Sequence, residues 1–372
     1  MRRTTYARYI VCFATADLPY ELPQHQTMEF AKELFSESFH DIERLLKVFA
    51  NGEIRKRHFS QPMEWFKEDH PLGDRNRCYI EDATTYSAMA IESCLEMGTF
   101  LKKSIQPSEI DAIVCVSSTG MSTPSLDARI MNKLPFRTDT KRIPLWGLGC
   151  AGGAAGLSRG YEYCLAYPKS AVLVVCVELC GLTFQKDDHS KSNLIGTSLF
   201  ADGVACALLV GDQSPLLKER KQEEYVAIQS TQSTLMPDSE DVMGWDVQNN
   251  GLNVVFSRSI PSIVSNWLEP VVTDYLKKED VALEDIDAFI AHPGGKKVLE
   301  AYEKALKFSS EKTALSRFVL SEYGNMSSPT VLYVLKACME QEHEQGEKGL
   351  IAALGPGFCS EMLLVEWRGE GA

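Results

Sequence analysis

One glycine- and alanine-rich segment restricts the fold of this chain more than any other feature. Residues 146–157 read Trp-Gly-Leu-Gly-Cys-Ala-Gly-Gly-Ala-Ala-Gly-Leu. An apolar strand is expected over residues 143–146, and the small residues after it are expected to form a helix. Because residues 151–157 are nearly all alanine and glycine, this helix must be packed tightly on several sides. The segment therefore predicts a helix enclosed by the rest of the protein.

Strand-like and helix-like segments alternate along the chain, which is the pattern of an α/β protein. Strands are expected over residues 9–16, 112–116, 171–178, 204–210, 288–291, 350–354 and 362–366. Helices are expected over residues 27–39, 81–101, 152–167, 261–275, 295–305 and 327–339. Most of these strands are nearly continuous apolar runs, as expected when both faces of a sheet are covered.

A faint internal repeat suggests that the chain consists of two similar halves. Residues 110–114 (Ile-Asp-Ala-Ile-Val) recur as residues 286–290 (Ile-Asp-Ala-Phe-Ile), and residues 207–210 resemble residues 362–365. The first spacing also places Cys150 opposite the neighbour of Asn325. A duplication would present loops from both halves at the matching ends of their sheets, where α/β proteins usually place their sites. We expect one half over residues 1–220 and the other over residues 221–372.

Composition excludes several classes of function. The formal net charge of −13 argues against a general nucleic-acid binder, although a local basic patch could still bind a small anion. No run of about 18 apolar residues is present, so no membrane span is expected. The eleven cysteines include no Cys-x-x-Cys pair, which indicates buried, reduced thiols in a cytoplasmic protein and no metal site.

Cys150 is the main candidate for a catalytic residue. It lies where the expected strand ends and the small-residue helix begins. The unpaired N–H groups and the positive end of a helix dipole at that position favour a thiolate. The alternative is a small buried residue in a tight turn. The glycines around Cys150 favour the nucleophile, because they allow a sharp turn and a close approach by a ligand.

The same segment also satisfies a dinucleotide-binding pattern. Gly147, Gly149 and Gly152 match G-x-G-x-x-G, and a later strand ends in the acidic Glu178. A dinucleotide-dependent oxidoreductase is therefore an alternative. It is less favoured because the match lies in mid-chain and because a cysteine in that loop has no role in holding a pyrophosphate.

His292 and Asn325 are the other candidates for catalysis. His292 follows an apolar strand and precedes Pro-Gly-Gly, so its ring is expected to point into a shaped loop. Asn325 lies in Gly-Asn-Met-Ser-Ser-Pro, where a turn residue or a helix cap is the simpler reading. Taken with Cys150, the two residues form a Cys/His/Asn set suited to nucleophilic catalysis.

A short basic run is a candidate for binding phosphates. Arg55, Lys56 and Arg57 are consecutive in an otherwise acidic protein. Such runs are usually solvated surface, but this one could bind the phosphates of a carrier.

Five short motifs, taken together and in this order, resemble those of the thiolase-fold condensing enzymes. They are Gly-Leu-Gly-Cys150-Ala-Gly-Gly, Leu199-Phe200-Ala-Asp-Gly, Ala-His292-Pro-Gly-Gly, Gly-Asn325-Met-Ser-Ser and Leu-Gly355-Pro-Gly-Phe. The chain is most similar to the type III polyketide synthases, which are the chalcone-synthase-like family, and among these to bacterial alkylpyrone synthases. The resemblance implies an αβαβα sandwich of two similar halves, a homodimer, and coenzyme A thioesters as substrates with no cofactor.

The resemblance also implies roles for particular residues. Cys150, His292 and Asn325 would form the catalytic triad, and Phe200 would be a gatekeeper between the coenzyme A tunnel and the cavity. Thr123 would reach the partner's site across the dimer interface. The remaining cavity residues would be Cys180, Thr183, Ser327, Gly355, Pro356 and Gly357.

One departure from the family pattern concerns the substrate. A second gatekeeper phenylalanine, common in plant members, is replaced by Val254 in an ungapped count back from Pro261. A valine would widen the passage and favour a flexible acyl chain over a bulky aromatic starter.

The expected reaction is an iterated decarboxylative condensation of malonyl-CoA onto an acyl group held by Cys150. His292 would pair with the thiolate as an imidazolium, and N–H groups of His292 and Asn325 would stabilise the enolate. A long-chain fatty acyl starter and an alkylpyrone product are expected. The nearest alternative is an initiation-type ketoacyl-carrier-protein synthase, and a non-catalytic acyl-CoA-binding protein is a further one.

Overall fold

Nine strands form one hydrogen-bonded sheet within residues 8–36, 39, 41–221 and 225–369, which the computed structural model describes. Their order is β11-β12-β13-β8-β1-β7-β6-β4-β5. The strands are β1 (Arg8–Thr15), β4 (Ala112–Val116), β5 (Lys141–Leu145), β6 (Ala171–Leu179), β7 (Asp202–Val210), β8 (Tyr225–Leu235), β11 (Ala288–Ala291), β12 (Lys348–Gly355) and β13 (Cys359–Arg368). Two antiparallel pairs of strands stand apart from this sheet. They are β2 (Tyr20–Pro23) with β3 (Lys56–Phe59), and β9 (Met243–Gln248) with β10 (Gly251–Phe256).

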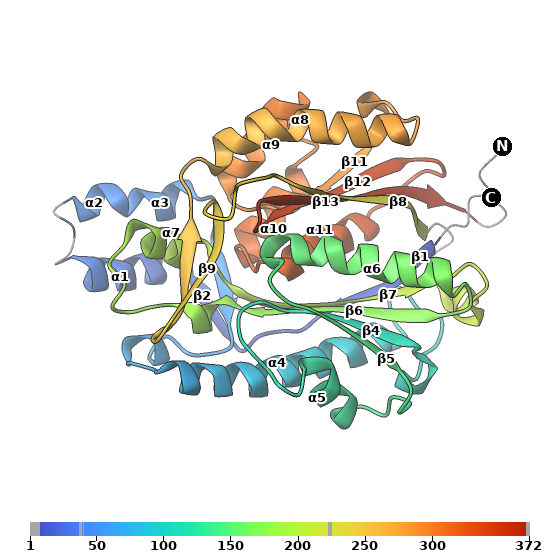
Figure 1. Ribbon diagram of the computed structural model, residues 1–372, viewed down its shortest axis with the longest axis horizontal. Helices are drawn as coiled ribbons and strands as arrows, with labels where there is room; N and C mark the ends of the chain where they lie inside the picture. Colours follow the sequence, from blue (N-terminus) through green and yellow to red (C-terminus); the bar gives the residue numbers. More distant parts are fainter. Residues whose placement is uncertain (1–7, 37–38, 40, 222–224, 370–372) are drawn as a thin grey trace.

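The helices complete a sandwich of five layers. They are α1 (Gln24–Phe35), α2 (Ile42–Leu45), α3 (Lys47–Asn51), α4 (Leu72–Leu95), α5 (Leu126–Lys133), α6 (Gly152–Ala166), α7 (Lys191–Leu199), α8 (Ile260–Lys278), α9 (Lys296–Leu306), α10 (Ala314–Tyr323) and α11 (Ser328–Met339). Short 3₁₀ turns are η1 (Trp65–Lys67), η2 (Pro107–Glu109), η3 (Gly149–Ala151), η4 (Cys180–Thr183), η5 (Pro215–Glu219) and η6 (Leu283–Asp285). Figure 1 shows α6 and α11 between two parts of the sheet, with α4 and α5 on one outer face and α8 and α9 on the other. This is the predicted αβαβα arrangement.

The two parts of the sheet have the same connectivity. In the first, β4 is parallel to β6, while β6 and β7, and β7 and β1, are antiparallel. In the second, β11 is parallel to β12, while β12 and β13, and β13 and β8, are antiparallel. The repeated sequence segments therefore occupy equivalent strands, β4 and β11 for the first pair and β7 and β13 for the second. The predicted duplication is confirmed.

The connection between the two halves lies between η5 and β8. The boundary expected at residues 220 and 221 falls in this connection, of which residues 222–224 lie outside the described part of the chain. Strand β1 pairs with β8 over only three residues, Arg8–Ile10, and joins the two parts into one sheet. We propose this connection as the division of the chain into its two halves.

Helix α6 is packed as its composition predicts. It contacts β4 and β6 of one half and β12 and β13 of the other, as well as α11. A Cβ atom on Gly153 would lie 2.6 Å from Val331 Cγ1 and 2.9 Å from Leu332 Cδ1, so α11 approaches the backbone of α6 directly. No larger residue fits at this crossing without moving α11.

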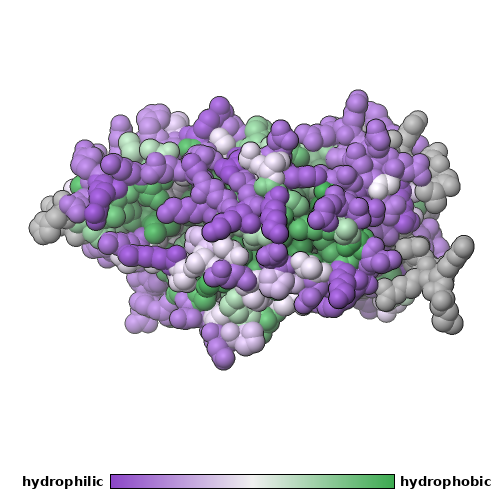
Figure 2. Space-filling model, turned by 90° about the horizontal axis from the view of Figure 1, so that it is seen from above, coloured by the Kyte–Doolittle hydropathy of each residue, from purple (hydrophilic) through white to green (hydrophobic). Residues whose placement is uncertain are grey.

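The outer helices are amphipathic. Helix α8 buries Ile260, Val264, Leu268 and Val272, which recur every four residues and form one face. Seen from above, the surface that carries α8 and α9 is mainly hydrophilic, with hydrophobic residues visible in recesses between polar side chains (Figure 2).

Some elements differ from the sequence-based expectations. Helix α4 begins at Leu72 rather than at residue 81. The sequence pattern missed its first turns because they are polar and show no apolar periodicity. The sequence pattern also gave no clear signal for α7, α10 or the β9–β10 pair. The basic run at residues 55–57 leads into β3, whose alternate side chains are buried.

Candidate active site

Cys150 lies in η3, two residues before the first residue of α6. Its side chain is buried, and the residue is 7% exposed. The thiol donates to Asn325 Oδ1 at a distance of 3.9 Å. The nucleophile candidate from the first half thus contacts a polar side chain from the second.

Asn325 is held by main-chain hydrogen bonds to the segment that carries Phe200. The Asn325 N–H donates to the Leu199 carbonyl at 2.9 Å, and the Ala201 N–H donates to the Asn325 carbonyl at 2.9 Å. Phe200 and Asn325 thereby form an isolated parallel bridge outside the main sheet. The side-chain Oδ1 also accepts from the Ser327 N–H at 2.8 Å, which orients the carboxamide.

His292 follows β11 in the second half, and its loop contacts Asn325. The main-chain N–H of His292 donates to the Ala352 carbonyl at 2.8 Å, which continues the β11–β12 pairing by one residue. Asn325 Nδ2 donates to the carbonyl of Gly294, two residues after His292, at 3.3 Å. Both ring nitrogens of His292 are buried and have no hydrogen-bond partner among the described residues. They are therefore free to bind a reacting group.

Burial sets the ionisation of Cys150 and His292. Desolvation raises the pKa of the Cys150 thiol to about 11, despite hydrogen bonds to Ser327 and Asn325 that lower it. Desolvation likewise lowers the pKa of His292 to about 3. Desolvation thus favours a neutral Cys150 thiol and a neutral His292 imidazole, whereas the helix N-terminus was expected to favour a thiolate.

Glu178 is a buried acid that the sequence patterns did not assign to this site. Its carboxylate accepts from the Ser118 N–H at 2.9 Å and from the hydroxyls of Ser118, Thr119 and Ser328 at 2.8–3.0 Å. Burial raises its pKa to about 7, and its charge contributes to the raised pKa of Cys150. A carboxylate occupied by these four donors is not a free ribose ligand, which removes one support of the dinucleotide reading.

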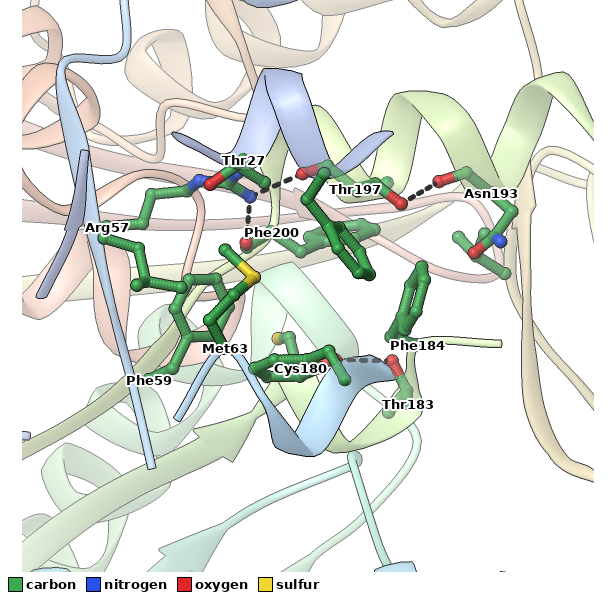
Figure 3. Close-up of a pocket in the computed structure, with 16 residues that line it drawn as sticks. Thr27, Arg57, Phe59, Met63, Cys180, Thr183, Phe184, Asn193, Thr197 and Phe200 are labelled. Carbon is green, nitrogen blue, oxygen red and sulfur yellow. Dashed lines mark hydrogen bonds between the residues drawn. The ribbon is translucent and has the colours of Figure 1, made fainter. Parts of the chain in front are cut away.

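A small, mainly apolar pocket lies beside Phe200. Four predicted cavity residues line it, namely Cys180, Thr183, Phe200 and Val254. Its other apolar lining residues were not predicted and are Leu22, Phe30, Phe59, Met63, Phe66 and Phe184. In Figure 3, Phe59, Phe184 and Phe200 point into the pocket from different sides. The pocket suits a hydrocarbon chain better than a polar ligand.

Two further aromatic rings support Phe200. The ring centroids of Trp245 and Phe256 lie 6.3 Å and 6.5 Å from that of Phe200. Both belong to the β9–β10 pair, which also supplies Val254. Aromatic residues therefore surround Phe200 even though position 254 is a valine.

The remaining predicted cavity residues lie elsewhere. Gly355 packs on the turn that holds Cys150, because a Cβ atom on it would lie 2.7 Å from the Ala151 nitrogen. Pro356 covers Gly149 of the same turn, and Ser327 hydrogen-bonds the sulfur. Gly357 lies beside Leu235 at the end of β8. Thr123 is exposed and does not line the pocket.

The basic run does not form one exposed phosphate site. Arg57 is 1% exposed and donates to the carbonyls of Thr197 and Phe200, so its guanidinium is turned inward, and its role in binding coenzyme A stays a prediction. Arg55 forms an ion pair with Glu322, and Lys56 forms one with Glu21. Alternation along β3 turns Arg57 inward while Lys56 faces outward.

The described residues contain neither a candidate metal site nor a helix that could span a membrane. No group of three or more His, Cys, Asp or Glu side chains is placed to hold a metal ion there. No helix in that part of the chain is both long and apolar enough to cross a membrane.

Comparisons with known proteins agree along nearly the whole chain. Models of the N-terminal and C-terminal domains of chalcone and stilbene synthases match residues 10–214 and 227–367. The chain is 49% identical over 361 residues to a Bacillus subtilis (strain 168) protein provisionally named a chalcone synthase, covering 97% of this chain and 99% of the relative. It is 29% identical over 332 residues, 87% of this chain and 82% of the relative, to the α-pyrone synthesis polyketide synthase-like protein Pks18 of Mycobacterium tuberculosis (strain CDC 1551 / Oshkosh). The solved structure of 1,3,6,8-tetrahydroxynaphthalene synthase from Streptomyces coelicolor A3(2), a bacterial type III polyketide synthase, superimposes with a TM-score of 0.89 at 29% identity, covering 97% of this chain and 99% of that one.

Proposed function

The chain belongs to the chalcone and stilbene synthase family of type III polyketide synthases, and we propose that it extends a long-chain acyl-CoA starter with malonyl-CoA. Members of this family are acyltransferases (EC 2.3.1 type). The observation that carries the proposal is the contact between Cys150 of one half and Asn325 of the other, next to the loop of His292. The three side chains supply a nucleophile, a base and two hydrogen-bond donors.

The first step loads the starter. The Cys150 sulfur attacks the thioester carbonyl of the acyl-CoA while neutral His292 accepts the thiol proton. The bond between the carbonyl carbon and the sulfur of coenzyme A breaks, and that sulfur leaves with the proton from His292. The acyl group is then a thioester of Cys150. Because desolvation favours the neutral form of both groups, their charges arise during the transfer.

The second step extends the chain. The thioester carbonyl oxygen of malonyl-CoA accepts hydrogen bonds from N–H groups of His292 and Asn325. The carbon–carbon bond to the carboxylate then breaks and releases CO₂. Negative charge moves to the carbonyl oxygen, where each donor is worth about 3 kcal/mol. The enolate carbon attacks the acyl thioester and releases the Cys150 sulfur. Phe200 provides an apolar wall that favours loss of the charged carboxylate as CO₂.

The pocket beside Phe200 supports a flexible acyl starter. It is lined mainly by apolar side chains, and a valine rather than an aromatic residue occupies position 254. The product returns to Cys150 for further extension, and ring closure gives an alkylpyrone. One relative is named for α-pyrone synthesis and one solved neighbour for tetrahydroxynaphthalene, so the family alone leaves the product open.

We further propose a cytoplasmic homodimer that uses coenzyme A thioesters and no cofactor. All eleven cysteines are free thiols, which is typical of a reducing compartment. Met121 and Trp146 are exposed apolar residues, and the Trp146 side chain is bonded to the loop that carries Thr123. In a homodimer whose second copy covers this surface, Thr123 of one subunit would lie near the active site of the other.

Mass spectrometry of products tests the proposal. The enzyme is incubated with malonyl-CoA and with acyl-CoA starters whose chains range from about two to about eighteen carbons. Pyrones extended by two-carbon units, formed best from long starters, are expected. Absence of malonyl-CoA turnover, or a single extension that requires a carrier protein, would refute it.

A further inference from the structure

Arg57 links two segments of the candidate active site. Its NH1 group donates to the carbonyls of Thr197 and Phe200, each at 2.7 Å. These carbonyls lie at the C-terminal end of α7, where the helix dipole is negative and a cation is favoured. The guanidinium therefore holds the backbone of Phe200 (Figure 3).

The aliphatic part of the same side chain contacts the loop of Asn325. A Cβ atom on Gly324 would lie 2.7 Å from Arg57 Cγ and 2.8 Å from Cδ, and Gly324 has φ +70°. The chain can approach Arg57 this closely only because residue 324 is glycine. Gly324 directly precedes Asn325, which forms the bridge with Phe200.

The burial of Arg57 requires an explanation. The residue is 1% exposed, and its Nε and NH2 atoms have no hydrogen-bond partner among the described residues. A cation at this depth is costly unless its interactions compensate, and the Asp202 carboxylate and the Phe59 ring, whose centroid lies 5.5 Å from Arg57 Cζ, supply part of that compensation. Burial lowers the pKa of Arg57 to about 9, so the guanidinium stays charged at neutral pH.

We propose that Arg57 is a positioning residue that sets Phe200 and Asn325 at the separation needed for malonyl-CoA decarboxylation. The inference rests on the proposed function. Arg57 also lines the pocket beside Phe200, but the inference assigns its guanidinium no polar contact with substrate. Since Cys150 lies on a different segment, acyl loading depends much less on Arg57 than decarboxylation does.

Two rates measured on each variant test the proposal. Loading is followed by the mass of the acyl-enzyme, and decarboxylation by formation of acetyl-CoA from malonyl-CoA. Arg57→Met is expected to lower the decarboxylation rate by up to about 100-fold, as for a displacement of about 1 Å, and to change loading little. Arg57→Lys keeps the positive charge but not the planar guanidinium with its several N–H donors, so it should recover part of the decarboxylation rate. Arg77→Met is the matched control, because the Arg77 side chain is 71% exposed and pairs only locally with Asp74 in α4, and it should change neither rate.

Gly324→Ala displaces Arg57 from the other side and should produce the same selective loss. Equal loss of both rates in Arg57→Lys, wild-type decarboxylation in Arg57→Met, or failure of Arg57→Lys to fold would each overturn the proposal, because each indicates a merely structural role or none. Absence of decarboxylation in the wild-type enzyme would instead refute the proposed function.

Discussion

The Cys150 thiol donates to Asn325 Oδ1 at 3.9 Å, although the two residues are separated by 175 positions in the sequence. The contact forms because each follows an equivalent part of its own half, one before α6 and the other before α11. These two helices pack against each other at the centre of the sandwich. The duplicated fold thus brings one side chain from each half to the same point.

Replacing the nucleophile separates the two steps of the reaction. Cys150→Ala should abolish formation of the acyl-enzyme but leave some malonyl-CoA decarboxylation, because the two proposed donors remain. Intact-protein mass spectrometry and acetyl-CoA release measure the two activities. Cys164→Ala, in the helix α6 that follows Cys150, is the control and should keep both. Loss of both activities in Cys150→Ala would argue for misfolding or a different role.

Removing the carboxamide should affect the enolate more than the acyl-enzyme. Asn325→Ala is expected to lower decarboxylation by about 100- to 1,000-fold, the usual effect of losing one such donor. Loading should fall less, because Asn325 neither attacks nor accepts the thiol proton. Single-turnover loading and steady-state decarboxylation provide the comparison. A proportional fall in both would count against this division of roles.

Filling the pocket should shorten the preferred starter. Val254→Phe places a ring beside Phe200 and reduces the space for an acyl chain. The ratio of kcat/KM for long to short acyl-CoA starters is expected to fall by about 10-fold or more. Val247→Phe is the matched control, because Val247 pairs with Leu252 in the same strand pair but is 54% exposed. An unchanged ratio in Val254→Phe would place the acyl chain elsewhere.

The buried acid Glu178 should make stability depend on pH. Its folded-state pKa of about 7 lies above the ordinary value of 4.5, so its contribution to stability is fully present below pH 4.5 and is lost as pH rises through 7. Glu178→Gln removes this loss, and the free energy of unfolding of the variant relative to the wild type should rise by about 3 kcal/mol across that window. Urea unfolding of both proteins at pH 5 and pH 8 gives the difference. An equal difference at the two values would show that Glu178 does not titrate there.

The crossing of α6 and α11 should tolerate no added methyl group. Gly153→Ala is expected to lower the free energy of unfolding by about 1–3 kcal/mol through overpacking. Gly73→Ala is the matched control, because nothing lies within 4 Å of a Cβ atom at this position in α4. The control should leave stability unchanged or raise it slightly. Equal effects of the two substitutions would contradict the close packing inferred for α6.

Local patterns were sufficient to predict the framework of the fold. Continuous apolar runs marked both faces of β4, β6 and β7 as covered, and the small residues of α6 required close neighbours. The repeated segments predicted the duplication. These features depend on residues close together in the chain, so the chain order alone reveals them.

The same patterns selected Cys150, His292 and Asn325 as candidates but did not predict the pKa shifts of Cys150 and His292. The glycines and the helix start were visible in the sequence, and they favoured a thiolate. The depth of burial depends on the other half of the molecule. Desolvation by those distant residues opposes the thiolate that the helix end favours, because burial penalises a charged group.

Arg57 shows most clearly what the sequence determined and what only the tertiary structure decided. The sequence determined that three consecutive basic residues occur where β3 begins. Side chains alternate along a strand, and the pairing of β3 with β2 together with the packing of α7 and Gly324 turns Arg57 inward and Lys56 outward. A shift of one residue in that register would exchange them, and only contacts between segments far apart in the chain set the register.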